Sequence, residues 1–494
     1  MAPSWFGCYT RRVVDHNQHS ASGAGQLLRV LGPVRATALV VGSIIGTGVF
    51  IKPASMAEAL GSASLVLLAW IAAGLLSLAG ALTYAELGAR HPRAGGEYVY
   101  IKEAYGPLPA FLFGWMRFWI GSPGSIAAFG VGSATFLAAV APVEQDFPGG
   151  IAGLAVTLVV ALTLVNLLTV SLSSGFQTFL TILKVLAVIG LAIVLFVAGR
   201  EPSDVVPLGP HPLPATDAAG PGFAAFMVAV LAALWAFDGW NNMPMVAGEV
   251  KRPERNIPLA LVIGMALVAT LYLFADRAYF SVLTVEEIAA LAQKGAPPVA
   301  TVALQTALTD HGGEVAVRFM SLVFVVSALG AMTGSILTGA RVPYAMAADG
   351  LFHRSFARLS GARVPAVSVA VQGAVAAILA ASGTFDQLTN AVVFASWIFY
   401  GMCAGALFVL RRREARALGA GGAARAGYRV PLYPALPVVF IAVAAVLLVV
   451  TVIEMPLLSA IGLGVIALGV PIYAWLVRGA AKSAASSAGG TTSS

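Results

Sequence analysis

The chain has few charged residues for its length. Asp, Glu, Lys and Arg make up 10% of its 494 residues, whereas an ordinary soluble domain carries about 25%. Hydrophobic residues make up 59%, and the mean hydropathy is +0.88. This composition excludes a soluble domain and predicts an all-α integral membrane protein that lies in a lipid bilayer. The net charge of +7 does not indicate nucleic-acid binding, because the basic residues lie in short loops between apolar segments.

Cysteine is also scarce, with only Cys8 and Cys403 in the chain. One lies in the amino-terminal tail and the other in a late apolar segment, so we expect no disulfide framework. The polar, basic stretch 1–35 lacks the apolar core of a secretory leader, and we therefore expect no cleavable signal peptide.

Groups for catalysis or metal binding are missing from the apolar segments. All six histidines lie outside them, at positions 16, 19, 91, 211, 311 and 353. No lysine follows a glycine, so the chain has no P-loop. These absences argue against an enzyme, a metal site, a cofactor and an ATP-driven pump.

Hydropathy predicts twelve transmembrane helices. They cover approximately residues 36–60, 63–88, 106–139, 149–170, 176–198, 222–249, 257–283, 315–345, 364–382, 386–410, 431–453 and 455–477. No connection between them is long enough for a soluble domain. We therefore predict one transporter domain over 36–477, with an amino-terminal tail over 1–35 and a carboxy-terminal tail over 478–494.

The distribution of basic residues predicts the orientation. With the amino terminus in the cytoplasm, 22 of the 29 Lys and Arg residues fall on the cytoplasmic side, three on the outer side and four within spans. Cytoplasmic loops of membrane proteins carry an excess of Lys and Arg. We therefore expect both termini in the cytoplasm and a cell-membrane (plasma or inner membrane) location.

Two glycine-containing interruptions lie in the middle of apolar segments, at 42–50 and at 235–241. Each glycine costs a helix about 1 kcal/mol relative to Ala, so both helices are expected to unwind there. Spans 1–5 and 6–10 run in opposite directions because five is odd. Paired interruptions in oppositely oriented halves are typical of the binding site of a secondary transporter. We therefore predict an inverted repeat, 36–198 and 222–410, followed by two extra helices over 431–477.

The unwound segments offer ligands for both charges of an amino acid. Amides freed at Gly46, Thr47 and Gly48, with the Thr47 hydroxyl and the helix dipole, suit a carboxylate. Carbonyls freed at the ends of the preceding half-helices suit an ammonium group. The alternative is that these glycines only permit close helix packing. The predicted substrate-binding residues are Ile44, Ile45, Gly46, Thr47, Gly48, Trp235, Phe237, Asp238, Gly239 and Asn241.

Asp238 is a carboxylate at the centre of the sixth span, where insertion costs at least ~2.5–3.5 kcal/mol. Three roles are open: pairing with a cationic substrate side chain, binding a coupling cation, or accepting hydrogen bonds from unwound backbone.

Lys184 is the one lysine deep in a span. Its ammonium group could connect carbonyls of the first span to the fifth, where another transporter would hold sodium, or it could extend to the membrane surface. Arg117, Asp276 and Arg277 are the other charges considered at membrane depth; the last two are expected near the outer end of the seventh span, and we assign none of the three a role.

Several of these motifs together resemble a known family. Gly42-Ser-Ile-Ile-Gly-Thr-Gly-Val-Phe50 is similar to the first-helix motif of amino acid–polyamine–organocation (APC) transporters. Phe237-Asp-Gly-Trp-Asn241, with the segment 248–258, resembles their L-type amino acid transporter branch. The segments 95–98 and 334–341 add to the resemblance, which covers about residues 30–480.

This resemblance implies a LeuT-type 5+5 inverted-repeat fold with discontinuous helices 1 and 6. It also implies amino acid exchange or uptake by alternating access, with Lys184 in the place of a sodium site. Eukaryotic members of the branch join an ancillary glycoprotein through a cysteine in the loop after span 3. Here the loop 140–148 has no cysteine, so no disulfide-linked partner is expected.

The sequence therefore predicts a secondary active transporter of free L-amino acids, and favours sodium-independent exchange of neutral ones. A proton-coupled carrier of cationic amino acids or polyamines is the alternative. A channel or inorganic-ion carrier on the same fold is a third possibility, which saturation and trans-stimulation of flux would distinguish.

Overall fold

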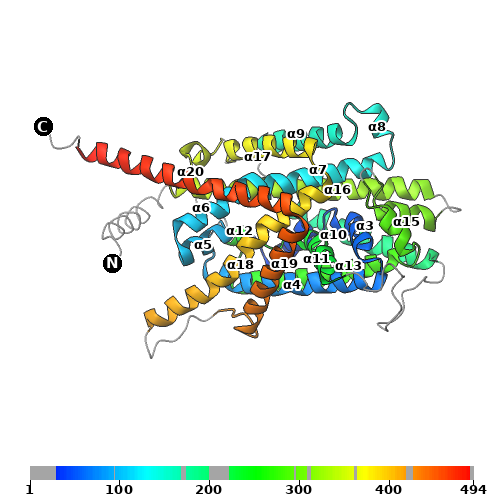
Figure 1. Cartoon of the computed structure of the whole chain (residues 1–494), viewed down its shortest axis with the longest axis horizontal. Helices are drawn as coiled ribbons and strands as arrows, with labels where there is room; N and C mark the ends of the chain where they lie inside the picture. The colour runs from blue at the N-terminus through cyan, green and yellow to red at the C-terminus, as the bar shows by residue number, and fades with distance from the viewer. Residues whose placement is uncertain are drawn as a thin grey trace.

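The computed structural model describes residues 29, 31–93, 95–168, 174–199, 222–293, 296–308, 313–360, 364–418 and 427–489. Throughout these residues the regular secondary structure is helical, apart from one isolated bridge between Leu31 and Val250 (Figure 1). The predicted amino-terminal tail lies outside the described residues except at its last positions, as do the end of the carboxy-terminal tail and most of the connection 199–221.

Within the described residues, ten segments are long and apolar enough to cross a membrane. They are α4 (Ala63–Arg90), α6 to α7 (Pro107–Ala138), α9 (Gly150–Leu168), α10 (Ser174–Ala198), α11 to α12 (Phe223–Met245), α13 (Pro253–Tyr279), α16 (Gly313–Ala348), α18 (Phe385–Leu418), α19 (Ala435–Glu454) and α20 (Pro456–Gly489). The bent pair α2 (Pro33–Ile44) and α3 (Gly48–Leu60) makes an eleventh. The predicted span 364–382 is a shorter apolar helix, α17 (Ala366–Ser382). The chain is thus a multi-pass membrane protein, and twelve crossings remain a prediction.

Short helices fill the connections between the long ones. They are α5 (Glu97–Tyr105), α8 (Val143–Asp146), α14 (Val285–Ala290), α15 (Val299–Ala307) and the single turns η3 (Ala247–Glu249) and η4 (Arg354–Ala357). The predicted span 106–139 contains a π-helical segment, η2 (Arg117–Gly121), between α6 (Pro107–Met116) and α7 (Ser122–Ala138). Such π-turns inside α-helices occur often at functional sites.

Both glycine-containing interruptions are breaks in the helices. The first helix ends at Ile44 and resumes at Gly48, with a bend of 42° between the two halves. The second, α11 (Phe223–Phe237), ends before Asp238, and α12 (Asn242–Met245) follows after a turn.

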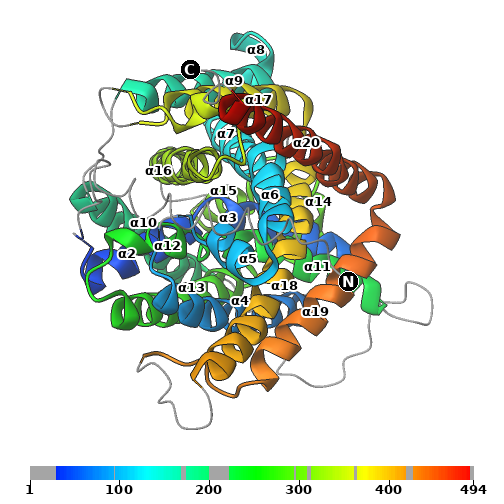
Figure 2. The same ribbon diagram turned by 90° about the vertical axis from the view of Figure 1, so that its left-hand side faces the viewer.

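The helices pack in two groups around these breaks. One group contains α2, α4, α11 and α13, and the other contains α7, α9, α16 and α17 (Figure 2). The breaks of α2–α3 and α11–α12 face α7, η2 and α16 across the middle of the molecule. The candidate site lies between the two groups.

Ion pairs connect α18 to α3 near its beginning and to α4 near its end. Near its beginning, Asp386 accepts from the fully buried Lys52 of α3 at 2.7 Å. Near its end, Arg411 pairs with Glu86 of α4 at 2.5 Å. Glu86 is fully buried and also accepts from the backbone amide of Val430 at 2.7 Å. At ~1.5 Å per helical residue, the two anchors are roughly 37 Å apart along α18.

Candidate functional site

The two helix breaks are in direct contact. A β-carbon on Gly48 would lie 2.7 Å from the Cα and Cβ atoms of Ala236, and one on Gly239 would lie 2.6 Å from the carbonyl oxygen of Ser43. Gly239 also has a φ of +119°, a conformation that side chains rarely adopt. Glycine is therefore required at both positions for the breaks to approach each other this closely.

The first break presents unused backbone donors. The amides of Gly46, Thr47 and Gly48 donate no hydrogen bond to any residue that the structure describes. The Thr47 hydroxyl is buried and likewise has no partner there. Because buried amides are almost always paired, three unused ones at the start of α3 are available to bind a ligand that carries negative charge.

Two side chains hold the carbonyls around the same break. The Lys184 ammonium group donates to the carbonyl oxygens of Gly42 and Ile45, each at 3.0 Å. Lys184 is 3% exposed, so its ammonium group lies inside the protein and not at the membrane surface. The Tyr272 hydroxyl lies 3.1 Å from the carbonyl oxygen of Ile44 and 3.0 Å from that of Ala236, within donating distance of both breaks.

Asp238 follows the last residue of α11. Its carboxylate accepts from the Tyr400 hydroxyl of α18 at 2.8 Å and also interacts with the backbone amide of Gly239. Tyr400 is buried among Trp240, Trp397 and other aromatic rings. The carboxylate is thus partly satisfied by the protein, as one of the three predicted roles requires.

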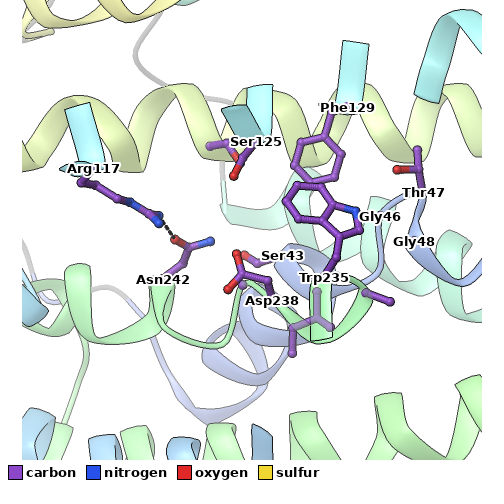
Figure 3. Close-up of a pocket in the computed structure, with 14 residues that line it drawn as sticks. Ser43, Gly46, Thr47, Gly48, Arg117, Ser125, Phe129, Trp235, Asp238 and Asn242 are labelled. Atoms are coloured by element: carbon purple, nitrogen blue, oxygen red, sulfur yellow. Dashed lines mark hydrogen bonds between the residues drawn. The ribbon is translucent and has the colours of Figure 1, made fainter. Parts of the chain in front are cut away.

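The pocket between the helix groups contains most of the predicted binding residues (Figure 3). Those that line it are Ile44, Gly46, Thr47, Gly48, Trp235, Asp238 and Gly239. The indole of Trp235 packs against the ring of Phe129, with centroids 5.6 Å apart.

Three predicted residues do not line this pocket. The Phe237 ring packs in the core against Trp70 and Tyr272. Asn241 is fully buried and donates to the Glu97 carboxylate at 3.1 Å. Ile45 is also fully buried, and its carbonyl oxygen binds Lys184.

Glu97 begins α5, which lies outside the membrane-spanning segments, and its side chain is fully buried. Burial raises the pKa of the Glu97 carboxyl to about 7, although the nearby charge of Arg117 and the hydrogen bond from Asn241 oppose this. The Glu97 carboxyl, with a pKa near neutrality, is thus hydrogen-bonded to Asn241, the residue that precedes α12.

The pocket also contains residues that the sequence did not place there. Ser43, Ala236, Ser125, Phe129 and Ser335 line it, together with two polar residues that contact each other. The guanidinium Nη2 of Arg117 donates to the Asn242 side-chain oxygen at 3.3 Å. The sequence identifies Arg117 as a charged residue within a predicted span. No neighbouring motif in the sequence indicates that its side chain enters the pocket.

Asp276 is more buried than the sequence suggested, although it does lie near the end of α13. The sequence suggested that its side chain reaches the lipid headgroups, whereas the side chain is fully buried beside Trp70 and Tyr272. Arg277, the next residue, is only partly buried, because adjacent side chains on a helix point in different directions.

Comparison with known proteins agrees with this architecture. A family model described as "Amino acid permease" matches residues 31–477. The chain therefore belongs to the amino acid permease family, and is an APC-superfamily amino acid transporter similar to the L-type branch.

Its relatives are transporters and exchangers rather than enzymes. The serine/threonine exchanger SteT of Bacillus subtilis is 32% identical over 429 residues, which cover 84% of this chain and 89% of the relative. The human b(0,+)-type amino acid transporter 1 is 31% identical over 391 residues, covering 78% and 76%. The human large neutral amino acids transporter small subunit 2 is 27% identical over 470 residues, covering 93% and 83%.

Proposed function

We propose that this protein exchanges neutral L-amino acids across the membrane by alternating access, without sodium. The observation that carries the proposal is the set of unused amides at Gly46, Thr47 and Gly48. A substrate carboxylate would accept from these amides and from the Thr47 hydroxyl. The carbonyl oxygens of the two breaks have two lone pairs each, so Ile44 and Ala236 can accept from the substrate ammonium group as well as from Tyr272.

Sodium independence is proposed from Lys184. Its ammonium group binds two carbonyl oxygens of the first break, which are the kind of hard oxygen ligands that an alkali cation would take. A fixed positive charge there repels a second cation. Lys184 would therefore connect the first break to α10 in place of a bound sodium ion. If Lys184 instead exchanges a proton during each cycle, uptake would acidify the vesicle lumen.

Exchange and neutral substrates have support from the names of the relatives. One relative is a serine/threonine exchanger and another is a large neutral amino acids transporter. In the pocket of this chain, Asp238 is bound by Tyr400 and faces the charge of Arg117, which makes it a poor partner for a cationic substrate.

A second candidate function is favoured by Asp238 alone. Its carboxylate is the acidic side chain among the pocket-lining residues, and it could pair with lysine, arginine or a polyamine. The protein would then be a carrier of cationic substrates, coupled to protons or working by exchange.

The membrane arrangement is proposed from charge and chain order. We place both termini in the cytoplasm of a cell membrane, with residues 36–198 and 222–410 as an inverted repeat of the LeuT type. No disulfide-linked ancillary subunit is proposed, because the loop 140–148 has no cysteine.

A panel of amino acids tests the proposal. Purified protein in proteoliposomes would be loaded with unlabelled alanine, and uptake of labelled alanine would be competed with neutral, cationic and acidic amino acids. We expect saturable uptake that internal alanine accelerates, with neutral competitors the most effective. Flux that neither saturates nor responds to internal substrate would indicate a channel, and strong aspartate transport would contradict both candidate functions.

A further inference from the structure

Arg117 is positioned by an irregularity in its helix. It begins the π-helical segment η2, which shifts the register between α6 and α7. A β-carbon on Gly121 would lie 3.0 Å from the Cδ atom of Arg117, so the glycine leaves room for the arginine side chain one turn away. The local backbone and the small neighbour together direct a long cationic side chain into the protein.

The guanidinium group is buried without a direct counter-ion. Arg117 is 6% exposed and lines the pocket, and its hydrogen bond goes to the neutral amide oxygen of Asn242. Its Nε atom has no partner, and within the described chain no carboxylate oxygen lies within 4.0 Å of the group. Arg411, by contrast, has two close contacts with the Glu86 carboxylate.

Two carboxyl groups, the partly buried Asp238 and the fully buried Glu97, are affected by this charge at longer range. The positive charge of Arg117 acts on both Asp238 and Glu97. Each carboxyl has its own neutral partner, Tyr400 for Asp238 and Asn241 for Glu97. Figure 3 shows Arg117 reaching Asn242 from one side of the pocket, with Asp238 beyond that contact.

The charged side chains that line the described pocket are therefore one cation and one carboxylate, Arg117 and Asp238. Leaving a buried charge without compensation costs several kcal/mol. A substrate with a third full charge on its side chain would leave one charge in the pocket unmatched, whereas a neutral side chain would not.

We propose that Arg117 is a specificity-determining residue. Its positive charge balances the negative charge of Asp238 in the pocket, and lysine, arginine and similar cationic substrates are thereby excluded. This inference rests on the proposed transport of neutral amino acids and explains how a pocket containing a carboxylate achieves it. Arg117 acts through the charge balance of the pocket and needs no contact with the substrate. Selectivity built by placing a repulsive charge against the wrong ligand is a general route to discrimination.

A double-mutant cycle tests the inference. Exchange of labelled alanine would be measured in proteoliposomes for wild type, Arg117→Gln, Asp238→Asn and the double variant, with lysine and glutamate as competitors. Arg117→Gln should strengthen lysine competition relative to unlabelled alanine by roughly tenfold or more, the effect of one charged hydrogen bond. Asp238→Asn should strengthen glutamate competition instead. The double variant should return to a neutral preference, and Arg117→Lys, which keeps the charge, should resemble wild type.

Each failure has its own meaning. If Arg117→Gln exchanges alanine but gains no lysine competition, or if Arg117→Lys changes selectivity as much as Arg117→Gln, the inference is overturned and the proposed function remains. The Asp238→Asn arm does not depend on the folding of Arg117→Gln, and unchanged glutamate competition there would also overturn the inference. If wild type exchanges no neutral amino acid, the proposed function fails and the inference fails with it.

Discussion

Gly48 at the start of α3 lies against Ala236 near the end of α11, so closely that a β-carbon on Gly48 would fall 2.7 Å from the alanine Cα and Cβ atoms. The two broken helices thus touch beside the unused amides of the first break. The close helix packing, and the substrate binding proposed at these amides, both require that residue 48 has no side chain.

Replacement of Gly48 by Val should abolish amino acid exchange while the protein still inserts in the membrane. The added side chain would separate α3 from Ala236 and obstruct the amides that are proposed to bind the carboxylate. Exchange in proteoliposomes and the amount of monodisperse protein in detergent are the measurements. Gly190→Val is the matched control, because Gly190 is in a helix and open space surrounds its β-carbon position. Normal exchange by Gly48→Val would contradict the proposed site.

Lys184→Ala should reduce the rate of exchange more than the affinity for alanine. The substitution removes two charged hydrogen bonds that join α10 to the first break, a loss of ~1.5–3 kcal/mol each, and so should alter the conformational change of α2. We expect a rate at least about tenfold lower, with a larger effect on one face of the membrane. Thr181→Val is the control, since Thr181 on the same helix donates to the carbonyl oxygen of Ala38, outside the break. Equal losses in the two variants would argue against a special role for the lysine.

The locations of the helix breaks could be predicted from the sequence, because Gly46, Gly48 and Gly239 weaken a helix wherever they occur in it. The position of Asp238 at the second break could be predicted for the same local reason, because Gly239 follows it in the sequence. The contacts across the molecule could not: Tyr272 bridges two breaks from α13, and Arg117 reaches Asn242 from another helix. Helix periodicity does not determine which neighbour a side chain faces. Ile45, Phe237 and Asn241 were therefore predicted to bind substrate, although none of the three lines the pocket.

The Glu97 carboxyl should make stability depend on pH. Burial raises its pKa from 4.5 to about 7, so the contribution to stability is fully present below pH 4.5 and is lost as the pH rises through 7. The loss is on the order of 3 kcal/mol, since one pKa unit corresponds to ~1.4 kcal/mol. Between pH 5 and pH 8 the melting temperature of Glu97→Gln should therefore fall by less than that of the wild-type protein. An identical pH dependence in wild type and variant would contradict this assignment.

Glu86→Gln should destabilise the protein by about 3 kcal/mol, because Arg411 loses its buried carboxylate partner while Arg90 keeps only its ion pair with Glu414. Thermal unfolding in detergent is the measurement. Glu103→Gln is a suitable control, since Glu103 makes an ion pair at 3.7 Å with Arg93 and both side chains are exposed to solvent, by 45% and 74%. Exposed pairs contribute only ~0–1 kcal/mol. Comparable melting temperatures for the two variants would show that the buried network is not what holds α4 to α18.

The most direct test of the proposed function is the uptake of labelled alanine into alanine-loaded proteoliposomes, with sodium replaced by choline on both sides. The account predicts that uptake saturates, that internal alanine accelerates it and that the rate is the same with and without sodium. Excess arginine should compete poorly with alanine in the wild-type protein. A strict sodium requirement, or uptake unaffected by internal alanine, would contradict it.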